Sequence, residues 1–167
     1  MILNCKNSTL ILGYLFMKLN KKYDLLVSQN YFLKNFKEHD IEKKYINWLN
    51  DNEVNKYLEI RFQKQTKNLA KKYINSFYQS EEKYLWGVYN KKQNLIGTSS
   101  LYNINRNHGL ASISIMIGDK DYWGTSATIE AKTLIINYAF NKIKIRKIIA
   151  SSYSVNLAIN FTLKKLG

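Results

Sequence analysis

The sequence predicts a mixed α/β (α+β) fold in which helices pack on a mostly antiparallel sheet. Three consecutive runs of strand-forming residues between residues 84 and 118 are joined by short polar turns, a pattern typical of an antiparallel meander. On both sides of these runs lie segments with an apolar residue at every third or fourth position, which is typical of amphipathic helices. Strands and helices mixed in this order indicate a layered domain.

The chain length and composition indicate a single globular domain. With 167 residues the chain can build one sizeable core, but not two ordinary ones. Apolar residues account for 46% of the chain and aromatic residues for 14%, which is typical of folded domains and not of disordered chains. We expect an N-terminal tail over residues 1–28 and one domain over residues 29–167.

The first half of the domain predicts one strand followed by three helices. These elements are expected at residues 31–36, 39–49, 50–58 and 66–77. The first segment alternates apolar and polar residues, whereas the second and fourth carry an apolar stripe at helical spacing. Asp51 or Asn52 can cap the third segment, and Thr66 begins the fourth.

The second half predicts the meander, a long helix, a further strand and a final helix. The strands are expected at residues 84–89, 94–104, 109–118 and 145–153. The long helix carries its apolar stripe from Ala131 to Ala139, and the final helix is expected over residues 156–167.

The formal net charge of +14 raises the alternative of a nucleic-acid-binding module. Only three of the 26 basic residues are arginines (Arg61, Arg106 and Arg146), although phosphate and base recognition favours the guanidinium group. The lysines are also spread along the chain and form no concentrated block. We therefore favour a solvated basic surface that attracts small anions, and we expect no nucleic-acid partner.

The few cysteines and histidines, and the N-terminal residues, argue against a disulfide, a metal site and a membrane anchor. Cys5 is the only cysteine, and with only His39 and His108 beside it a structural zinc site is not expected. A chain without internal disulfides fits the reducing cytoplasm. The apolar run at residues 8–16 is shorter than the roughly 20 residues that span a bilayer, and it lacks a basic start and a cleavage site. We expect a cytoplasmic protein with no membrane contact and no metal.

The segment DKDYWGTSAT, residues 119–128, leads directly into the long helix. A strand that turns into a helix leaves unpaired N–H groups at the helix N-terminus, and these donors form an anion site together with the helix dipole. Gly124, Ser126, Ala127 and Thr128 are small enough for a phosphate to approach the main chain. The same residue types also cap helices, so the local chemistry leaves phosphate binding and simple capping open.

Residues 107–140 resemble the acetyl-CoA-binding core of the GNAT superfamily of N-acetyltransferases. In the subgroup that acetylates ribosomal-protein N-termini, and in its amino-sugar-acetylating relatives, an Ile-Gly-Asp-like turn precedes Tyr-Trp-Gly-Lys-Gly, two residues and Thr-Glu-Ala. This chain has IGDKDYWG at 117–124, with Glu130 and Ala131 in register. ASSYSVN and NLAINFTLKKLG match the family's next strand and Asn-begun helix, and INWLNDNEVNKYLEIRF resembles its acceptor-side helices. The likeness covers residues 31–167.

The resemblance implies a GNAT-like sheet and acetyl-CoA as the co-substrate. In the family, main-chain groups of one strand hold the pantetheine arm and the thioester, and the following turn holds the pyrophosphate. The matching coenzyme-binding residues here are Ile115, Met116, Ile117, Trp123, Gly124, Thr125, Ser126, Ala127, Thr128 and Asn156.

This chain departs from the family in the turn and at its C-terminus. The family has Gln or Arg, then Gly, then Gly or Ala where this chain has Trp123, Ser126 and Thr128. A serine suits a right-handed backbone, whereas the β-branched Thr128 either crowds the pyrophosphate or gives it a hydroxyl group. Relatives usually continue with two more strands beyond the position of Gly167, so we expect a sheet that is either truncated at this end or completed elsewhere.

The catalytic positions of the family are also altered. Relatives often place a glutamate base and a tyrosine acid at the positions of Ser151 and Leu163, and neither residue can transfer a proton. Tyr153 is our candidate acid, because a phenol can protonate the departing thiolate; a buried strand tyrosine is the alternative. Glu59 and Arg61 are the candidate acceptor-binding residues, with a surface salt bridge as the alternative.

The resemblance implies an acetyl-CoA-dependent N-acetyltransferase that acts on a primary amine. We prefer an amino-sugar nucleotide as the acceptor, because Arg61 can pair with its phosphates. A protein N-terminal acetyltransferase is one alternative. A degenerate, non-catalytic acyl-CoA-binding member is another, because of the substituted glycines and the missing acid and base. The oligomeric state stays open, with a homodimer among the alternatives.

Overall fold

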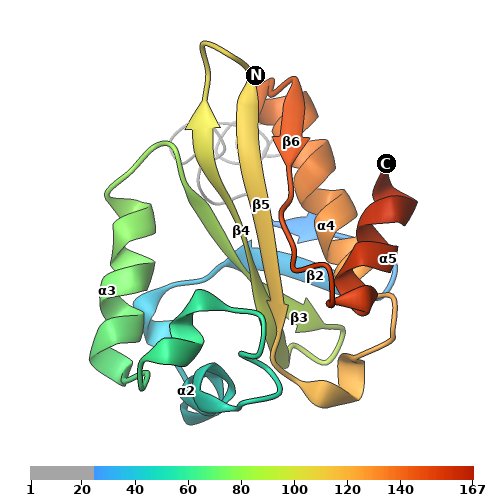
Figure 1. Cartoon of the computed structure of the whole chain (residues 1–167). Coiled ribbons are helices and arrows are strands. Elements are labelled where there is room, and N and C mark those ends of the chain that lie inside the picture. The colour runs from blue at the N-terminus through green and yellow to red at the C-terminus, as the bar shows by residue number, and fades with distance from the viewer. Residues whose placement is uncertain (1–24) are drawn as a thin grey trace, which may run out of the picture.

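The computed structural model describes residues 25–167 and has a six-stranded sheet at its centre (Figure 1). The strands follow each other across the sheet in chain order: β1 (Leu26–Val27), β2 (Tyr31–Asn35), β3 (Tyr84–Asn90), β4 (Leu95–Asn105), β5 (Leu110–Ile117) and β6 (Lys147–Ile149). The first four pairings are antiparallel, and β5 and β6 are parallel. The prediction of a mixed α/β fold with a mostly antiparallel sheet is therefore confirmed.

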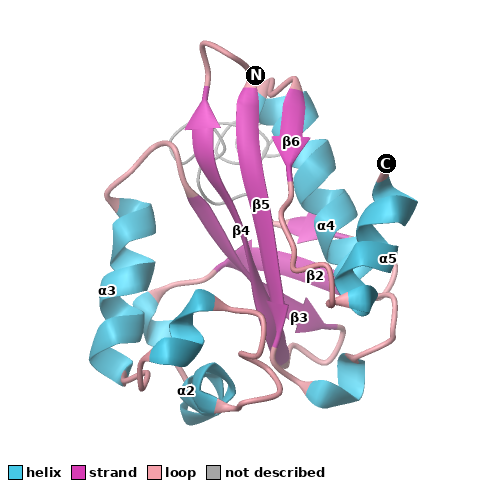
Figure 2. Ribbon diagram, in the orientation of Figure 1, coloured by secondary structure: helices cyan, strands magenta, loops and turns pink. Residues whose placement is uncertain are grey.

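Helices lie on both sides of this sheet (Figure 2). The α-helices of the described residues are α2 (Lys43–Asn50), α3 (Lys67–Tyr78), α4 (Ala127–Tyr138) and α5 (Leu157–Leu166). Residues of α2 and α3 share one hydrophobic cluster and residues of α4 another, which gives a three-layer arrangement. Thr66 precedes α3 as predicted, because its side chain accepts a hydrogen bond from the Leu69 N–H.

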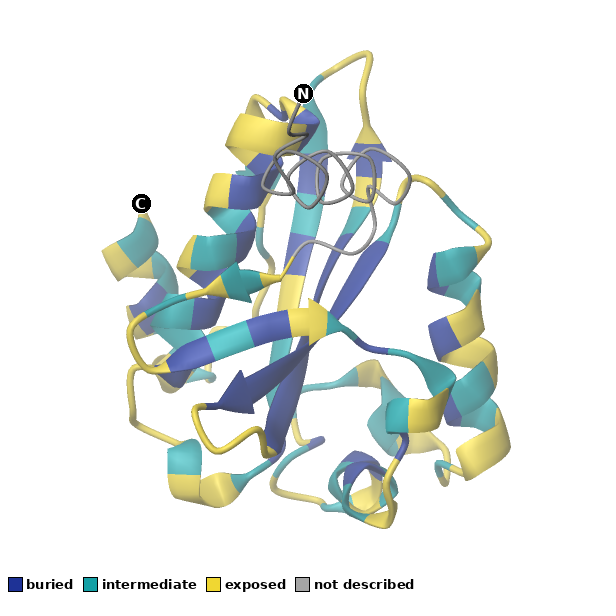
Figure 3. Cartoon of the chain, turned by 180° about the vertical axis from the view of Figure 1, so that it is seen from behind, coloured by how far each residue is buried: buried dark blue, intermediate teal, exposed yellow. Residues whose placement is uncertain are grey.

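Strand β3 lies between the two hydrophobic clusters and is buried along its whole length (Figure 3). Trp86 and Val88 belong to the cluster beneath α4, whereas Leu85 and Tyr89 belong to the cluster beneath α2 and α3. This alternation is the two-residue period of a strand that is covered on both faces. The sheet is thus held rigidly between the two helical layers.

The helix predicted over residues 50–58 is wrong, because this segment forms successive turns that end in a short 3-10 helix, Glu59–Phe62. The Asp51 carboxylate accepts a hydrogen bond from the Glu53 N–H at 2.9 Å and lies 2.9 Å from Lys120 Nζ. Lys120 also bonds Glu53. A side chain that occupies local backbone donors competes with helix formation, and the lysine then fixes the turns in place.

The strand predicted over residues 145–153 is shorter than expected. β6 ends at Ile149, which pairs with Ser112 of β5, and the chain then leaves the sheet. Figure 1 shows β6 beside only one end of β5. Within the described residues, the part of β5 from 113 to 117 therefore has β4 as its one strand neighbour.

Expectations for residues 1–24, among them Cys5, the apolar run at residues 8–16 and most of the tail, lie outside the described residues. Leu26 and Val27, which the sequence placed in the tail, form β1 and pair with Leu33 and Phe32 of β2. Between residues 25 and 167, no helix has both the length and the apolar character needed to cross a bilayer.

Candidate active site

The open edge of β5 is the first feature of the candidate site. β5 pairs with β4 as far as Ile117, which lies opposite Gly97, but with β6 only as far as Ser112. Backbone N–H and C=O groups on such an edge can bind an extended ligand in the way that they would bind another strand. The edge includes Ile115 and Met116, for which the sequence predicts main-chain contacts with the pantetheine arm.

The turn between β5 and α4 supplies further backbone donors. The 3-10 helix Lys120–Tyr122 and Gly124, which has a φ of +75°, redirect the chain into α4. Among residues 25–167, the N–H groups of Thr128 and Ile129 have no hydrogen-bond acceptor. These donors lie at the positive end of α4 and beside the end of β5, so the turn can bind an anion.

Ser126 occupies the family's glycine position without strain. Its backbone has a φ of −71° and a ψ of −4°, a right-handed conformation that any residue adopts. Its hydroxyl group donates to Glu130 Oε1 at 2.7 Å, and the neighbouring Thr125 hydroxyl donates to the Tyr122 carbonyl at 2.7 Å. Both hydroxyl groups thus bond within the turn, and neither takes up the N–H of Thr128.

Glu130 is an anchor for the start of α4. Burial works to raise the pKa of its carboxyl group, but hydrogen bonds from Ser126, Ser28 and Asn30 outweigh this effect and lower the pKa to about 2. The ionised carboxylate is therefore bonded both to the residue before α4, Ser126, and to the turn before β2, which contains Ser28 and Asn30. Its contacts explain its position in the first turn of the helix without a catalytic role.

Trp123 lies at the end of the open edge of β5. Its indole N–H donates to the Ile117 carbonyl at 2.8 Å, and the ammonium group of Lys120 lies 5.8 Å from the centre of its ring. The residue is 45% exposed. The residue at the family's Gln/Arg position is thus fixed to β5 and presents an apolar surface beside the turn.

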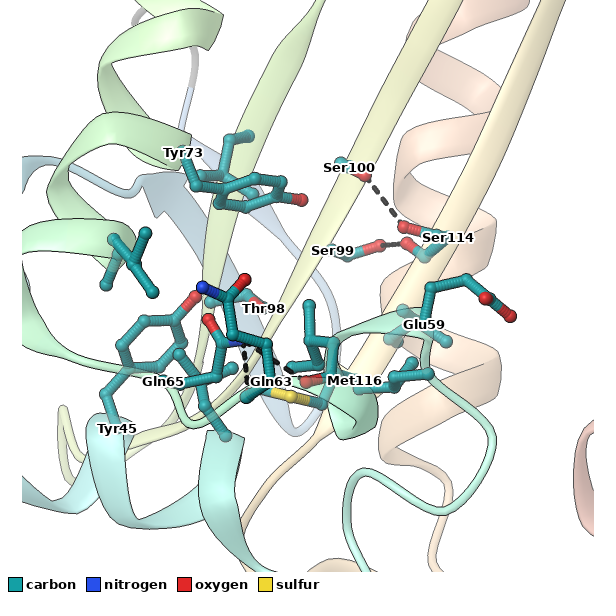
Figure 4. Close-up of a pocket in the computed structure, with 17 residues that line it drawn as sticks. Tyr45, Glu59, Gln63, Gln65, Tyr73, Thr98, Ser99, Ser100, Ser114 and Met116 are labelled. Atoms are coloured by element: carbon teal, nitrogen blue, oxygen red, sulfur yellow. Dashed lines mark hydrogen bonds between the residues drawn. The ribbon is translucent and has the colours of Figure 1, made fainter.

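A cavity of about 500 Å³ lies between the helical layer of α2 and α3 and the strands β4 and β5 (Figure 4). This volume is within the range of about 300–1,000 Å³ that is usual for small-molecule sites. Hydroxyl groups form much of its polar lining, from Tyr45, Tyr73, Thr98, Ser99, Ser100 and Ser114. Ile115 and Met116 of the open edge also line it, so the cavity reaches the strand that is expected to hold the thioester.

The cavity wall is mostly neutral. Ser99 Oγ donates to the Ser114 carbonyl at 2.6 Å, and the hydroxyl groups of Ser100 and Ser114 lie 2.8 Å apart. Burial raises the pKa of the Tyr45 phenol well above its ordinary value, so this group stays uncharged. Glu59 is the one charged residue among the described residues of the lining. A bound cation therefore meets a single carboxylate.

Glu59, Arg61 and Tyr153 meet beside the cavity. Tyr153 Oη donates to Glu59 Oε1 at 2.6 Å, and Arg61 Nη2 donates to Tyr153 Oη at 3.3 Å. Arg61 Nη1 lies 4.0 Å from Glu59 Oε1 and donates to the Leu58 carbonyl at 3.1 Å. The candidate acid and the two candidate acceptor-binding residues thus form one cluster, although the sequence suggested separate roles for them.

The remaining predicted residues lie away from the cavity lining. Asn156 begins α5, where its side chain accepts a hydrogen bond from the Ile159 N–H at 3.4 Å. The residues from Trp123 to Ser126 form the turn before α4, and Ala127 and Thr128 are the first two residues of that helix. Within residues 25–167 no group of three or more carboxylate, histidine or cysteine side chains is arranged to hold a metal ion.

Sequence reasoning missed the hydroxyl lining of the cavity. Thr98, Ser99 and Ser100 are consecutive in β4, and all three are buried. A run of polar residues in a buried strand is a usable signal, because each side chain needs a polar partner or a polar cavity. Tyr45 and Tyr73 gave no comparable signal, since a tyrosine on an apolar helical stripe fits a core equally well.

Comparison with known protein families agrees with this geometry. Residues 31–167 match the family model described as the acetyltransferase (GNAT) domain. A comparison of the sequence with curated proteins gave no significant match.

Solved structures share the fold at low sequence identity. A spermidine N-acetyltransferase from Vibrio cholerae, solved with CoA and spermine, has a TM-score of 0.72 and 19% identity over 82% of this chain and 79% of its own. A GNAT-family acetyltransferase from Bacillus anthracis has a TM-score of 0.71 and 17% identity over 86% and 82%. A Vibrio cholerae protein proposed to be a ribosomal-protein-serine acetyltransferase has a TM-score of 0.68 and 16% identity over 87% and 83%. At these identities the likeness concerns the fold.

Proposed function

The chain belongs to the GNAT family of acetyltransferases, and from this premise we propose that it acetylates the primary amine of a hydroxylated small molecule of the amino-sugar class. The family establishes the reaction class and acetyl-CoA as the donor. The acceptor is inferred from the cavity.

The contact between the cavity and the open edge of β5 carries this proposal. Ile115 and Met116 belong to both features, and Glu59 lies on the cavity wall. An amine in this cavity therefore lies close to a thioester aligned along the edge, and the exposed carboxylate of Glu59 is available beside it. Bringing the two reactants together in this way supplies much of what acetyl transfer requires from a protein.

The donor is proposed to bind along the edge of β5 and the turn that follows it. The N–H groups of Thr128 and Ile129 suit a pyrophosphate, because they lie at the positive end of α4 and have no acceptor among the described residues. The main chain of β5 from Ile115 to Ile117 suits the amide groups of the pantetheine arm. Asn156, the N-cap residue of α5, is a further candidate contact for the pantetheine arm.

The composition of the cavity wall supports an amino sugar as the acceptor. Sugar hydroxyl groups both donate and accept hydrogen bonds, as do the serine, threonine and tyrosine hydroxyl groups of the wall. A single carboxylate, Glu59, matches a single ammonium group. A polyamine such as spermidine, the substrate in the name of one structural neighbour, would leave its other ammonium groups without a carboxylate partner in this cavity.

A nucleotide-linked amino sugar is the more specific acceptor that we propose within this class. Arg61 is the cation nearest to Glu59 and Tyr153, and it would have to exchange its bond with Tyr153 for a bond with a phosphate. A free amino sugar requires no such exchange.

Thiol release in the presence of acetyl-CoA and a panel of amines tests the proposal. The panel contains glucosamine, a uridine-diphosphate-linked amino sugar, spermidine and a short peptide with a free N-terminal alanine. We expect the highest kcat/KM for one of the two amino sugars. Binding of acetyl-CoA, measured by calorimetry, is expected for the free protein.

The outcomes separate the alternatives. A peptide or spermidine that outperforms both amino sugars would overturn the acceptor class. Acetyl-CoA binding without any amine-dependent thiol release would identify a degenerate, non-catalytic member of the family.

A further inference from the structure

One hydrogen bond joins the acceptor cavity to the chain that follows β6. Tyr153 Oη donates to Glu59 Oε1 at 2.6 Å, across 94 positions of the sequence. Glu59 begins the 3-10 helix Glu59–Phe62 in the connection between α2 and α3, whereas Tyr153 lies beyond the end of β6. The bond therefore joins the connection between α2 and α3 to the chain beyond β6.

The two ends of this bond face different reactants. Glu59 lines the cavity, and its side chain is 78% exposed, so an amine arriving from solvent can reach the carboxylate directly. Tyr153 lies four residues beyond Ile149, in the chain that leaves the sheet where β6 separates from β5. In the relay proposed below, the phenol serves the coenzyme sulfur and the carboxylate serves the amine.

Arg61 holds the pair in place. Its Nη1 donates to the Leu58 carbonyl at 3.1 Å and its Nη2 donates to Tyr153 Oη at 3.3 Å, and its side chain is only 26% exposed. A guanidinium group fixed in this way stabilises the negative charge that the phenol oxygen develops when it gives up its proton.

We propose that Glu59 and Tyr153 form a proton relay from the acceptor amine to the sulfur of coenzyme A, with Arg61 as a positioning residue. The inference rests on the proposed function and adds the residues that move the proton. It also explains how this chain can act without a base or an acid at Ser151 and Leu163, where relatives often carry them.

The relay moves one proton in each turnover. The neutral amine, formed after its ammonium group has lost a proton to solvent, attacks the thioester carbonyl; a C–N bond forms and the C–S bond breaks. The nitrogen passes its surplus proton to Glu59. Protonated Glu59 then donates to Tyr153 Oη, which reverses the direction of their hydrogen bond and frees the phenol proton for the departing thiolate. The products are an amide and a free thiol, and both residues return to their starting states.

Three variants test the relay: Glu59→Gln, Tyr153→Phe and the double variant, each assayed with acetyl-CoA and glucosamine. Each single change is expected to lower kcat about 100-fold, because general acid–base catalysis typically contributes about 10²–10⁴-fold. The double variant should be no slower than the slower single variant, because both changes break the same relay.

Two controls make the result specific. Acetyl-CoA binding measured by calorimetry should be unchanged in all three variants, since none of the changed side chains belongs to the turn before α4. Glu81→Gln removes an exposed carboxylate outside the cavity lining and should keep the full rate.

The same measurements can overturn the proposal. Losses that multiply in the double variant would show that Glu59 and Tyr153 act independently, and a change in KM alone would reduce Glu59 to a binding group. Either result leaves the proposed function intact if the wild-type protein is active. A wild-type protein that binds acetyl-CoA but acetylates no amine would overturn both.

Discussion

Asn30 and Glu130 are bonded to each other twice, although 100 positions separate them in the sequence. The backbone N–H of Asn30 donates to Glu130 Oε2 at 3.0 Å, and its side-chain amide donates to Oε1 at 2.8 Å. The turn before β2 thereby fixes the first turn of α4. The backbone donors proposed to bind the coenzyme owe their position to this long-range contact.

Glu130→Gln is expected to lower the free energy of unfolding by about 1–2 kcal/mol at pH 7, because the new amide nitrogen cannot accept the bonds that the carboxylate accepts. The pKa of Glu130 is lowered from 4.5 to about 2. Its stabilising contribution is therefore complete above pH 4.5 and is lost as the pH falls toward 2. Urea unfolding of both proteins between pH 7 and pH 3 measures the difference, which should narrow in acid. A stability difference between the two proteins that stays constant with pH would show that the ionised Glu130 carboxylate is not its cause.

Lys132→Met is expected to stabilise the protein at neutral pH. Lys132 is only 2% exposed, and burial lowers its pKa from 10.5 to about 8. The wild-type protein is therefore destabilised by the buried charge below pH 8, and this penalty shrinks as the pH rises toward 10.5, where the unfolded chain also loses its proton. The gain at pH 7 should be up to about 3 kcal/mol.

Urea unfolding at several pH values checks this prediction. The advantage of Lys132→Met should diminish between pH 8 and pH 10. The matched control is Lys142→Met, which changes an exposed lysine and should alter stability little at any pH. A stability advantage of Lys132→Met that grows with pH would contradict the prediction.

Ser126→Leu is expected to weaken acetyl-CoA binding at least tenfold while leaving the fold intact. Ser126 is exposed at the start of α4, so a larger side chain disturbs no core packing but blocks the approach of a phosphate to the backbone donors. Calorimetric titration measures the affinity, and circular dichroism checks the fold. Ser126→Gly, which restores the family residue, should bind at least as well as the wild type. Unchanged affinity in the leucine variant would show that the coenzyme phosphates bind elsewhere.

Gly118→Ala is expected to impair the acceptor side more than the coenzyme side. A Cβ atom on Gly118 would overlap the indole ring of Trp48, which belongs to α2. The clash should push α2 away from the end of β5 and cost about 1–3 kcal/mol of stability. In kinetic assays the KM for the amine should rise more than the KM for acetyl-CoA.

A second substitution provides the control for this clash. Trp48→Leu in the Gly118→Ala background makes room for the new methyl group and should recover part of the lost stability. If the double variant is no more stable than Gly118→Ala alone, the contact with Trp48 is not the cause of the loss.

Local sequence patterns were sufficient for most of the elements. The alternation in residues 31–36, the three strand-like runs from residue 84 onward and the stripe of α4 each depend on residues that are close together in the chain. The spacing of apolar residues in each segment shows which of its faces is buried, and this spacing is visible without knowing which element packs against the segment. The predictions failed where a long-range contact decided the local structure. Asp51 and Glu53 favour turns over a helix because Lys120, far away in the chain, pairs with both.

The sequence by itself determined the order of the elements, the mixed sheet and the family, because these follow from the spacing of apolar residues and from a short motif around Trp123. It also singled out Glu59 and Arg61 as acceptor-binding residues and Tyr153 as a separate candidate acid. Only the tertiary structure decided that these three side chains touch, that β6 stops at Ile149 and leaves an edge of β5 open, and that six hydroxyl groups share one cavity with that edge. Such contacts depend on strand register and on how the helical layers close over the sheet, and no local pattern carries that information.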